Sequence, residues 1–138
     1  MRRLPLLLVM FAAVLLLGGC ASDQRNQSLI TTLNAYANTM RWGDFRTALQ
    51  FVDPKEREAH PPSALDMERY KQLKVSDYND DAGPRPSAEN EVRQVVQINL
   101  VNVHTQSERS VIDHQVWRYD PQEKRWWLMS GLPDITGE

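Results

Sequence analysis

The chain has 138 residues, with 16 lysine and arginine side chains against 18 aspartate and glutamate side chains and a formal net charge of −2. This length suits one domain, and without a basic cluster to neutralise phosphates we expect no nucleic-acid partner. Cys20 is the only cysteine, which excludes an internal disulfide, and the spacings of the three histidines match no metal motif, so we predict no metal or cofactor.

The N-terminal segment has the three parts of a secretory signal. Arg2 and Arg3 supply positive charge, residues 4–17 carry no charge, and two small glycines precede Cys20. The alternative is a transmembrane anchor, but the uncharged stretch that ends at Cys20 has 17 residues, whereas a span needs about 20. We therefore predict a signal peptide over residues 1–19.

The four residues Leu17-Gly18-Gly19-Cys20 resemble the lipobox of a bacterial lipoprotein. The resemblance implies cleavage between Gly19 and Cys20, a diacylglyceryl group on the Cys20 thiol, and an acyl chain on the freed amine. More than one acyl chain anchors a protein stably, because a single chain binds a membrane only marginally. The next residues, Ala21-Ser22, lack the aspartate that retains enterobacterial lipoproteins at the inner membrane. The resemblance therefore implies an outer-membrane protein that faces the periplasm.

Cleavage at this position leaves 119 residues with 14 basic and 18 acidic side chains, a formal charge of −4. Residues 20–27 are short and polar and are predicted to form a lipidated, flexible tether. A helix is predicted from Ser28, which can act as its cap, to Gly43. Its apolar residues recur at helical spacing and are Leu29, Ile30, Leu33, Tyr36, Ala37 and Met40.

Two shorter helices are predicted after Gly43. Asp44 can cap the first of them, whose apolar residues at helical spacing are Phe45, Ala48, Leu49 and Val52. Asp53 and Glu56 form a capping-box-like pair around Pro54, which favours a third short helix through Ala59. The proline pair that follows would end it.

The second half of the chain changes to the alternation that is typical of β-strands. We predict strands over residues 73–78, 92–103, 110–119 and 125–132, with a loop over 79–90 and a hairpin loop over 120–124. The second strand has Val96, Ile98 and Leu100 on one face and Val95, Val101 and Val103 on the other, which indicates a buried central strand or a bulged one. Helices followed by an antiparallel meander make an α+β fold.

This order is similar to that of the NTF2-like superfamily. The matching features are the helix end from Tyr36 to Trp42, the turn Gly43-Asp44 into a second helix, and the closing hairpin from Val116 to Pro133. The resemblance covers residues 28–133 and implies two to three N-terminal helices packed on a strongly curved antiparallel sheet that encloses a conical cavity, here a domain over 28–138. Members include isomerases, dehydratases, transport factors and domains without activity, so the fold names no function.

Asp113 and His114 are candidates for proton transfer. They are adjacent on a strand and point to opposite faces, so they cannot pair with each other. His114 shares a face with two apolar residues, so we expect it to line the cone. It could act there as a general base, or it could be a histidine of the cavity wall whose ring nitrogens are hydrogen-bonded. The resemblance implies that a base would pair with a tyrosine, for which Tyr36 and Tyr70 are candidates. No catalytic motif of the superfamily matches residue by residue, so we predict no catalytic residue.

The closing hairpin is rich in aromatic residues. Trp126 and Trp127 are neighbours and point to opposite faces, so both are buried only if the sheet is covered on both sides. One interpretation is a covered sheet. The other is an interface with a second copy of the chain or with an envelope protein, formed by Trp117, Trp126 and Trp127.

The sequence therefore predicts an outer-membrane lipoprotein whose periplasmic domain is a noncatalytic binding or protein-interaction module. Two alternatives stay open. One is an NTF2-like enzyme on a small apolar substrate, which needs an open cone with His114 beside a tyrosine or a carboxylate. The other is a structural subunit of an envelope or secretion assembly, which needs a filled cone and a wide exposed aromatic face.

Overall fold

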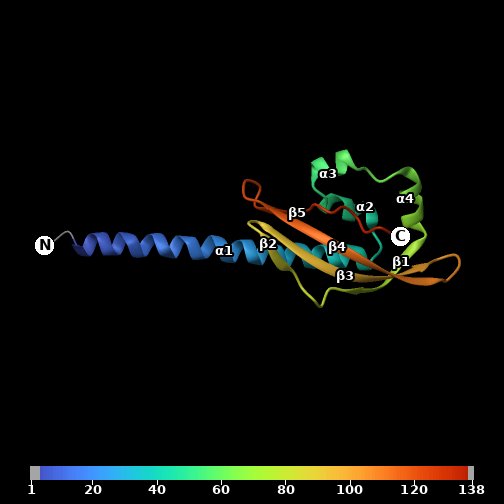
Figure 1. Cartoon of the computed structure of the whole chain (residues 1–138), viewed down its shortest axis with the longest axis horizontal. Coiled ribbons are helices and arrows are strands. Elements are labelled where there is room, and N and C mark those ends of the chain that lie inside the picture. Colours follow the sequence, from blue (N-terminus) through green and yellow to red (C-terminus); the bar gives the residue numbers. More distant parts are fainter. Residues whose placement is uncertain (1–3, 137–138) are drawn as a thin grey trace.

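The computed structural model describes the backbone of residues 4–136 and the side chains from residue 19 onward. The predicted positive start of the signal, Arg2 and Arg3, lies outside the described residues. The helices are α1 (Leu4–Arg41), α2 (Phe45–Ala48), α3 (Pro54–Ala59) and α4 (Ala64–Lys71), with a 3-10 turn η1 (Leu49–Phe51). The strands are β1 (Leu73–Asn79), β2 (Arg85–Ala88), β3 (Glu91–Asn102), β4 (Glu108–Asp120) and β5 (Arg125–Leu128) (Figure 1).

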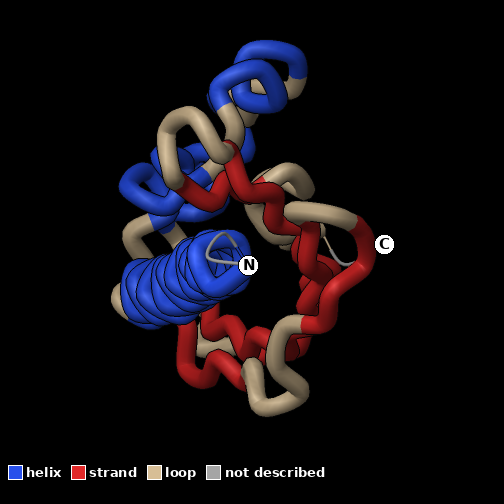
Figure 2. The backbone as a smooth tube through the Cα atoms, turned by 90° about the vertical axis from the view of Figure 1, so that its left-hand side faces the viewer, coloured by secondary structure: helices blue, strands red, loops and turns tan. Residues whose placement is uncertain are grey.

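The strands form one antiparallel sheet in the order β1-β3-β4-β5, and β2 pairs with β3. Figure 2 shows that the sheet curls strongly around α1, while the shorter helices lie beside it. The predicted fold class, α+β with helices packed on a strongly curved antiparallel sheet, is confirmed. One detail differs, because the predicted loop over residues 79–90 contains the short strand β2. Its four residues are all exposed, so no alternating pattern marked it.

Helix α1 does not begin at Ser28. It continues without a break through residues 20–27, so the prediction of a flexible tether there is wrong. The segment contains no glycine or proline to interrupt a helix, and tertiary contacts hold it. Arg25 donates from Nη1 to Asn90 Oδ1 at 2.8 Å, and Trp126 donates from Nε1 to the main-chain oxygen of Arg25 at 3.2 Å.

The predicted apolar stripe of α1 packs against the sheet. Its buried members are Leu29, Leu33, Tyr36, Ala37 and Met40. Ile30, which was expected to widen the stripe, is 54% exposed instead. The stripe is therefore narrower than the sequence suggested, and it leaves one side of the helix in solvent.

The turn after α1 follows the predicted pattern. Gly43 has a φ of +69°, a backbone conformation that suits glycine. Asp44 then caps α2 by accepting a hydrogen bond from Thr47 N at 3.0 Å. Asp53 caps α3 through Lys55 N and Glu56 N, but the reciprocal half of a capping box is absent, because the Asp53 amide donates to Leu128 O at 2.9 Å. This bond attaches α3 to the edge of β5.

Helix α4 has no counterpart among the predicted elements. It begins at a complete capping box, in which Ser63 Oγ accepts from Asp66 N and the Asp66 carboxylate accepts from Ser63 N. Its one buried residue is Tyr70. The Tyr70 hydroxyl donates to Pro133 O, which joins this helix to the C-terminal segment.

The two long strands set which side chains enter the core. On β3 the buried residues are Val92, Gln94, Val96, Ile98 and Leu100, so of the two apolar faces expected for this strand the one with Val96 enters the core. On β4 the buried residues are Val111, Asp113, Gln115 and Trp117. His114 lies between two of them and is exposed on the outer face. The prediction that His114 lines the cone is therefore wrong, because the β4 register turns the odd-numbered residues inward.

Candidate functional site

A network of buried polar side chains lies inside the curled sheet. Gln115 is its centre: its Nε2 donates to Asp113 Oδ2 at 2.8 Å and to the Tyr78 hydroxyl at 3.0 Å. Its Oε1 accepts from Trp117 Nε1 at 3.1 Å. The nitrogen and the oxygen of the Gln115 side-chain amide are thus both hydrogen-bonded, as is usual for a buried amide.

Asp113 is the titratable member of this network. Only 6% of the residue is exposed, and burial raises the pKa of its carboxyl to about 6. The hydrogen bond from Gln115 and the nearby His114 act in the opposite direction. A buried carboxyl with a raised pKa is a common feature of catalytic sites and also of structural networks. Access to solvent or substrate decides between the two.

Tyr36 has a different environment, although it is equally deep. Its hydroxyl is buried and has no hydrogen-bond partner among the described residues. Its ring makes edge contacts with Phe51 at 5.4 Å and with Trp117 at 5.3 Å between ring centroids. Burial, with Asp113 the next cause, raises the pKa of Tyr36 well above its ordinary value, so the hydroxyl stays protonated at neutral pH. Its ring is therefore a packing element of the core.

Tyr70 lies at the other end of the interior. Its hydroxyl donates to Pro133 O at 3.0 Å, and its ring stacks on Phe45 with 4.3 Å between centroids. Burial raises the pKa of Tyr70 to about 12. The two tyrosines singled out in the sequence are thus both buried. Neither hydroxyl is hydrogen-bonded to a histidine or a carboxylate.

The interior of the curled sheet is filled by side chains. Nine large residues have no more than 2% of their surface exposed: Trp117, Trp126, Tyr36, Met40, Ile98, Leu100, Leu128, Gln115 and Val96. Five pockets are described on this part of the chain, and neither Asp113 nor Tyr36 lines any of them. The polar network is thus enclosed by buried side chains and does not open into one of these five pockets.

The predicted aromatic interface needs correction for two of its three residues. Trp117 and Trp126 are 0% and 2% exposed, because both belong to the inner face of the sheet. Trp127 points outward, as the alternation required, and is half-buried. The Arg125 guanidinium lies 3.8 Å from the centroid of its ring and covers part of it. An interface through Trp117 or Trp126 is excluded by their burial.

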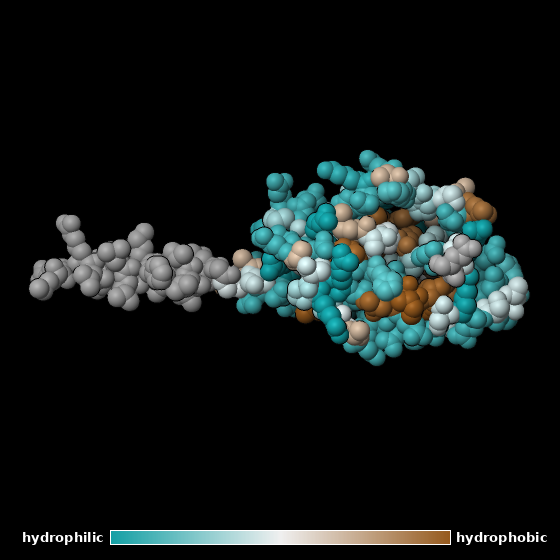
Figure 3. All heavy atoms as spheres, in the orientation of Figure 1, coloured by the Kyte–Doolittle hydropathy of each residue, from teal (hydrophilic) through white to brown (hydrophobic). Residues whose placement is uncertain are grey.

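Other apolar side chains are exposed. Val95 and Ile112 are 46% and 55% exposed on the outer face of β3 and β4, and Figure 3 shows apolar atoms gathered over these strands. Val95 lies opposite His114 and Ile112 opposite Gln97, so the two apolar residues are diagonal neighbours. Trp42, at the end of α1, is 88% exposed. Sequence reasoning missed it as an interface candidate, although its position outside the apolar stripe of α1 was a signal.

The largest of the five pockets described lies where α1 meets the β4–β5 hairpin. Its volume is about 550 Å³, within the range of ordinary ligand pockets. It is lined by Ala21, Ser22, Gln24, Arg25, Asn90, Tyr119, Pro121 and Lys124. We call it the basal pocket, because it lies at the end of the domain from which the N-terminal part of α1 projects (Figure 1).

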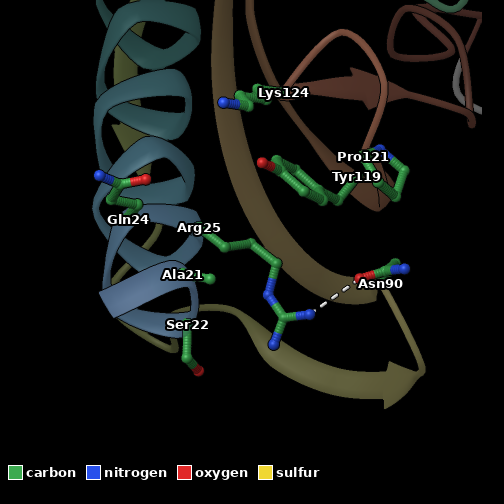
Figure 4. Close-up of a pocket in the computed structure, with 8 residues that line it drawn as sticks. All are labelled: Ala21, Ser22, Gln24, Arg25, Asn90, Tyr119, Pro121 and Lys124. Carbon is green, nitrogen blue, oxygen red and sulfur yellow. Dashed lines mark hydrogen bonds between the residues drawn. The ribbon is translucent and has the colours of Figure 1, made fainter. Parts of the chain in front are cut away.

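The basal pocket joins residues that are far apart in the sequence. In Figure 4, Arg25 reaches from α1 toward Asn90, while Lys124 and Tyr119 face the helix from the opposite wall. Sequence reasoning could not find this site, because Arg25 was assigned to a flexible tether. The only signal was the position of a cationic residue close to Cys20.

No protein-family model matches this chain, and no curated protein matches it either. Within the residues that the structure describes, no helix is long and apolar enough to cross a membrane.

Proposed function

We propose that this chain is a lipid-anchored outer-membrane protein whose domain, with an NTF2-like architecture over residues 28–138, is a noncatalytic binding or protein-interaction module facing the periplasm. The membrane is its first partner, through acyl chains on Cys20. Its other partner is either a further copy of the same chain or another envelope protein, which would bind to the outer surface of the domain.

The filled interior carries the noncatalytic part of this proposal. A reaction chamber needs a cavity in which substrate can reach the reacting groups. Here the inward side chains of α1 and the sheet occupy that volume, and Trp117, Tyr36 and Met40 have no exposed surface. His114, the residue that a proton-transfer mechanism would have used, lies on the opposite face from Asp113. A binding partner would therefore contact the outer surface of the domain rather than an interior cavity.

The residues around Cys20 support the anchor. Leu17-Gly18-Gly19-Cys20 has the order of a lipobox, and Cys20 is exposed, so its thiol is free of packing contacts that would block acylation. Two or more acyl chains on this residue would hold the protein at a bilayer without a spanning helix.

The enzyme alternative has one observation in its favour. Asp113 is a buried carboxyl with a pKa raised to about 6, and the unpartnered Tyr36 hydroxyl lies in the same interior. A motion that opened the curled sheet would expose both groups. The structural-subunit alternative is favoured by the exposed Trp42, Val95 and Ile112.

The anchor is tested by metabolic labelling with palmitate. Cys20→Ser should abolish incorporation of the label and leave the protein as an unprocessed precursor or release it from the membrane fraction. Ser22→Ala, two residues away, is the matched control and should be labelled and processed like the parent. Equal labelling of Cys20→Ser would contradict the proposal.

The noncatalytic role is tested by complementation of a deletion strain with the full-length chain. Asp113→Asn keeps the size of the side chain and its ability to accept from Gln115, but it cannot act as an acid or a base. We expect this variant, at normal abundance, to restore the envelope phenotype. Loss of complementation by a folded, abundant Asp113→Asn protein would favour the enzyme instead.

A further inference from the structure

We propose that the basal pocket binds the phosphate group of an anionic phospholipid in the membrane leaflet to which the chain is anchored. This inference rests on the proposed acylation of Cys20. It adds a specific headgroup site to the anchor, formed by the folded domain itself.

Distance along α1 places the pocket at headgroup level. Ala21, the residue next to Cys20, already lines it, and Arg25 follows five residues after the cysteine. A helix rises 1.5 Å per residue, so Arg25 lies about 8 Å from Cys20 along the axis. The polar region of a bilayer is roughly 5 to 8 Å thick on each side. An acylated Cys20 would therefore hold Arg25 at the level of the lipid phosphates.

The connection between anchor and pocket is rigid. Residues 20–27 are helical, and the Arg25–Asn90 and Trp126–Arg25 hydrogen bonds fix this part of α1 to the sheet. A flexible linker would let the domain drift away from the surface, whereas this helix keeps the pocket beside the lipids that surround the anchor. Proximity of this kind raises the effective concentration of headgroups at the site.

The charge of the lining selects an anion. Arg25 and Lys124 come from opposite walls, and no lining residue is acidic. Within the part of the chain that the structure describes, neither cation has a carboxylate within 4.0 Å. Arg25 uses Nη1 for Asn90, so its other N–H donors and the three of Lys124 are free for phosphate oxygens.

The positive charge of Arg25 and Lys124 contrasts with the net negative charge of the whole protein. The mature protein carries a formal charge of −4, so most of its surface would be repelled by an anionic leaflet. The two cations line the basal pocket, and an acylated Cys20 would turn this pocket toward the lipid. Neutral polar groups of Ser22, Gln24 and Tyr119 complete a lining that fits the glycerol and ester oxygens around a phosphate.

The test uses the lipidated mature protein in a neutral detergent and counts retained lipids by native mass spectrometry. With equal additions of phosphatidylglycerol and phosphatidylcholine, we expect phosphatidylglycerol to be retained at least fivefold more. Lys124→Asn should reduce this retention about fivefold, the effect of one basic residue near an anionic surface. Asparagine accepts the positive φ of 53° at this position, so the hairpin is preserved. Lys74→Asn, on the distant strand β1, is the matched control and should bind like the parent.

The results distinguish a lipid phosphate from a soluble phosphate as the ligand. They also distinguish failure of the headgroup site from failure of the Cys20 anchor. Equal retention of the two lipids, or equal loss in Lys74→Asn and Lys124→Asn, overturns the inference. Displacement of phosphatidylglycerol by an equimolar amount of glycerol 3-phosphate overturns the lipid as the source and assigns the pocket to a soluble phosphate. The intact mass of the same preparation reports acylation of Cys20 directly, so a missing anchor is distinguished from a pocket that does not bind.

Discussion

The indole nitrogen of Trp126 donates a hydrogen bond of 3.2 Å to the main-chain oxygen of Arg25, so the last strand of the sheet holds the first residues after Cys20. A segment that resembles a polar linker in the sequence is in this way part of the folded domain. Tyr119, whose ring lies 5.2 Å from that of Trp126, extends the same contact toward the basal pocket.

The first prediction concerns this bond. Trp126→Phe keeps an aromatic ring in the core but removes the donor, so the free energy of unfolding should fall by about 1 to 3 kcal/mol. Amide hydrogen exchange of residues 21–28 should accelerate at the same time. Trp127→Phe is the control, because this half-buried indole makes no hydrogen bond among those described. Unchanged exchange over 21–28 in Trp126→Phe would contradict the role of the bond.

A second prediction concerns the pH dependence of stability. Burial raises the pKa of Asp113 from 3.8 to about 6, so between these values the folded protein holds a proton that the unfolded chain has released. The contribution of this group to the free energy of unfolding is therefore largest below about pH 4 and is lost as the pH rises to about 6, by on the order of 3 kcal/mol.

Asp113→Asn should remove this dependence and make the protein more stable than the parent at pH 7. Urea unfolding at pH 4, 5, 6 and 7 measures the difference between variant and parent. Asp77→Asn, on the exposed side of β1, is the control and should follow the parent within about 0.5 kcal/mol. A constant difference between Asp113→Asn and the parent across this range would show that the carboxyl is not buried.

The third prediction contrasts two buried tyrosines. The Tyr36 hydroxyl has no described partner, so Tyr36→Phe removes an unsatisfied polar group and should stabilise the protein by about 1 kcal/mol. The Tyr70 hydroxyl bonds to Pro133 O, so Tyr70→Phe should destabilise it by about the same amount. Denaturant unfolding of both variants at one pH gives the comparison. Destabilisation by Tyr36→Phe would indicate that this hydroxyl has a partner.

A fourth prediction addresses the proposed homodimer. Pairing of two copies through the outer face of β3 and β4 would bury Ile112, so Ile112→Lys should convert a dimer into a monomer in sedimentation velocity while leaving the circular dichroism spectrum unchanged. Thr105→Lys, in the exposed β3–β4 turn, adds the same charge away from this face and should stay dimeric. A monomeric parent at tens of micromolar would leave an envelope protein as the partner.

The sequence was sufficient to predict those structural elements whose signals lie in neighbouring residues. The cap at Asp44, the turn at Gly43 and the alternation along β3 each depend on residues within one or two turns, and all three are confirmed. The tether prediction was wrong because its polar residues are held by contacts with Asn90 and Trp126. No local pattern reports contacts across 65 and 101 residues.

The face of β4 was misassigned for a similar reason. Both faces of this strand contain apolar residues, and His114 was expected inside because it shares its face with Ile112 and Val116. The long-range packing of Trp117 against Tyr36 brings the opposite, odd-numbered face inward. The polar Asp113 and Gln115 are tolerated there because each finds a buried hydrogen-bond partner. Satisfaction of polar groups is a property of the assembled core, so it could not be predicted from the strand alone.

The Trp126–Arg25 bond also limits when the protein can fold. The first helix is synthesised long before β5, and Ile135, three residues from the end of the chain, is 4% exposed in the core. The core around Ile135 cannot close until this late segment is available to pack against the sheet. Until then the apolar stripe of α1 stays uncovered, and chains with such late long-range contacts fold slowly and aggregate readily.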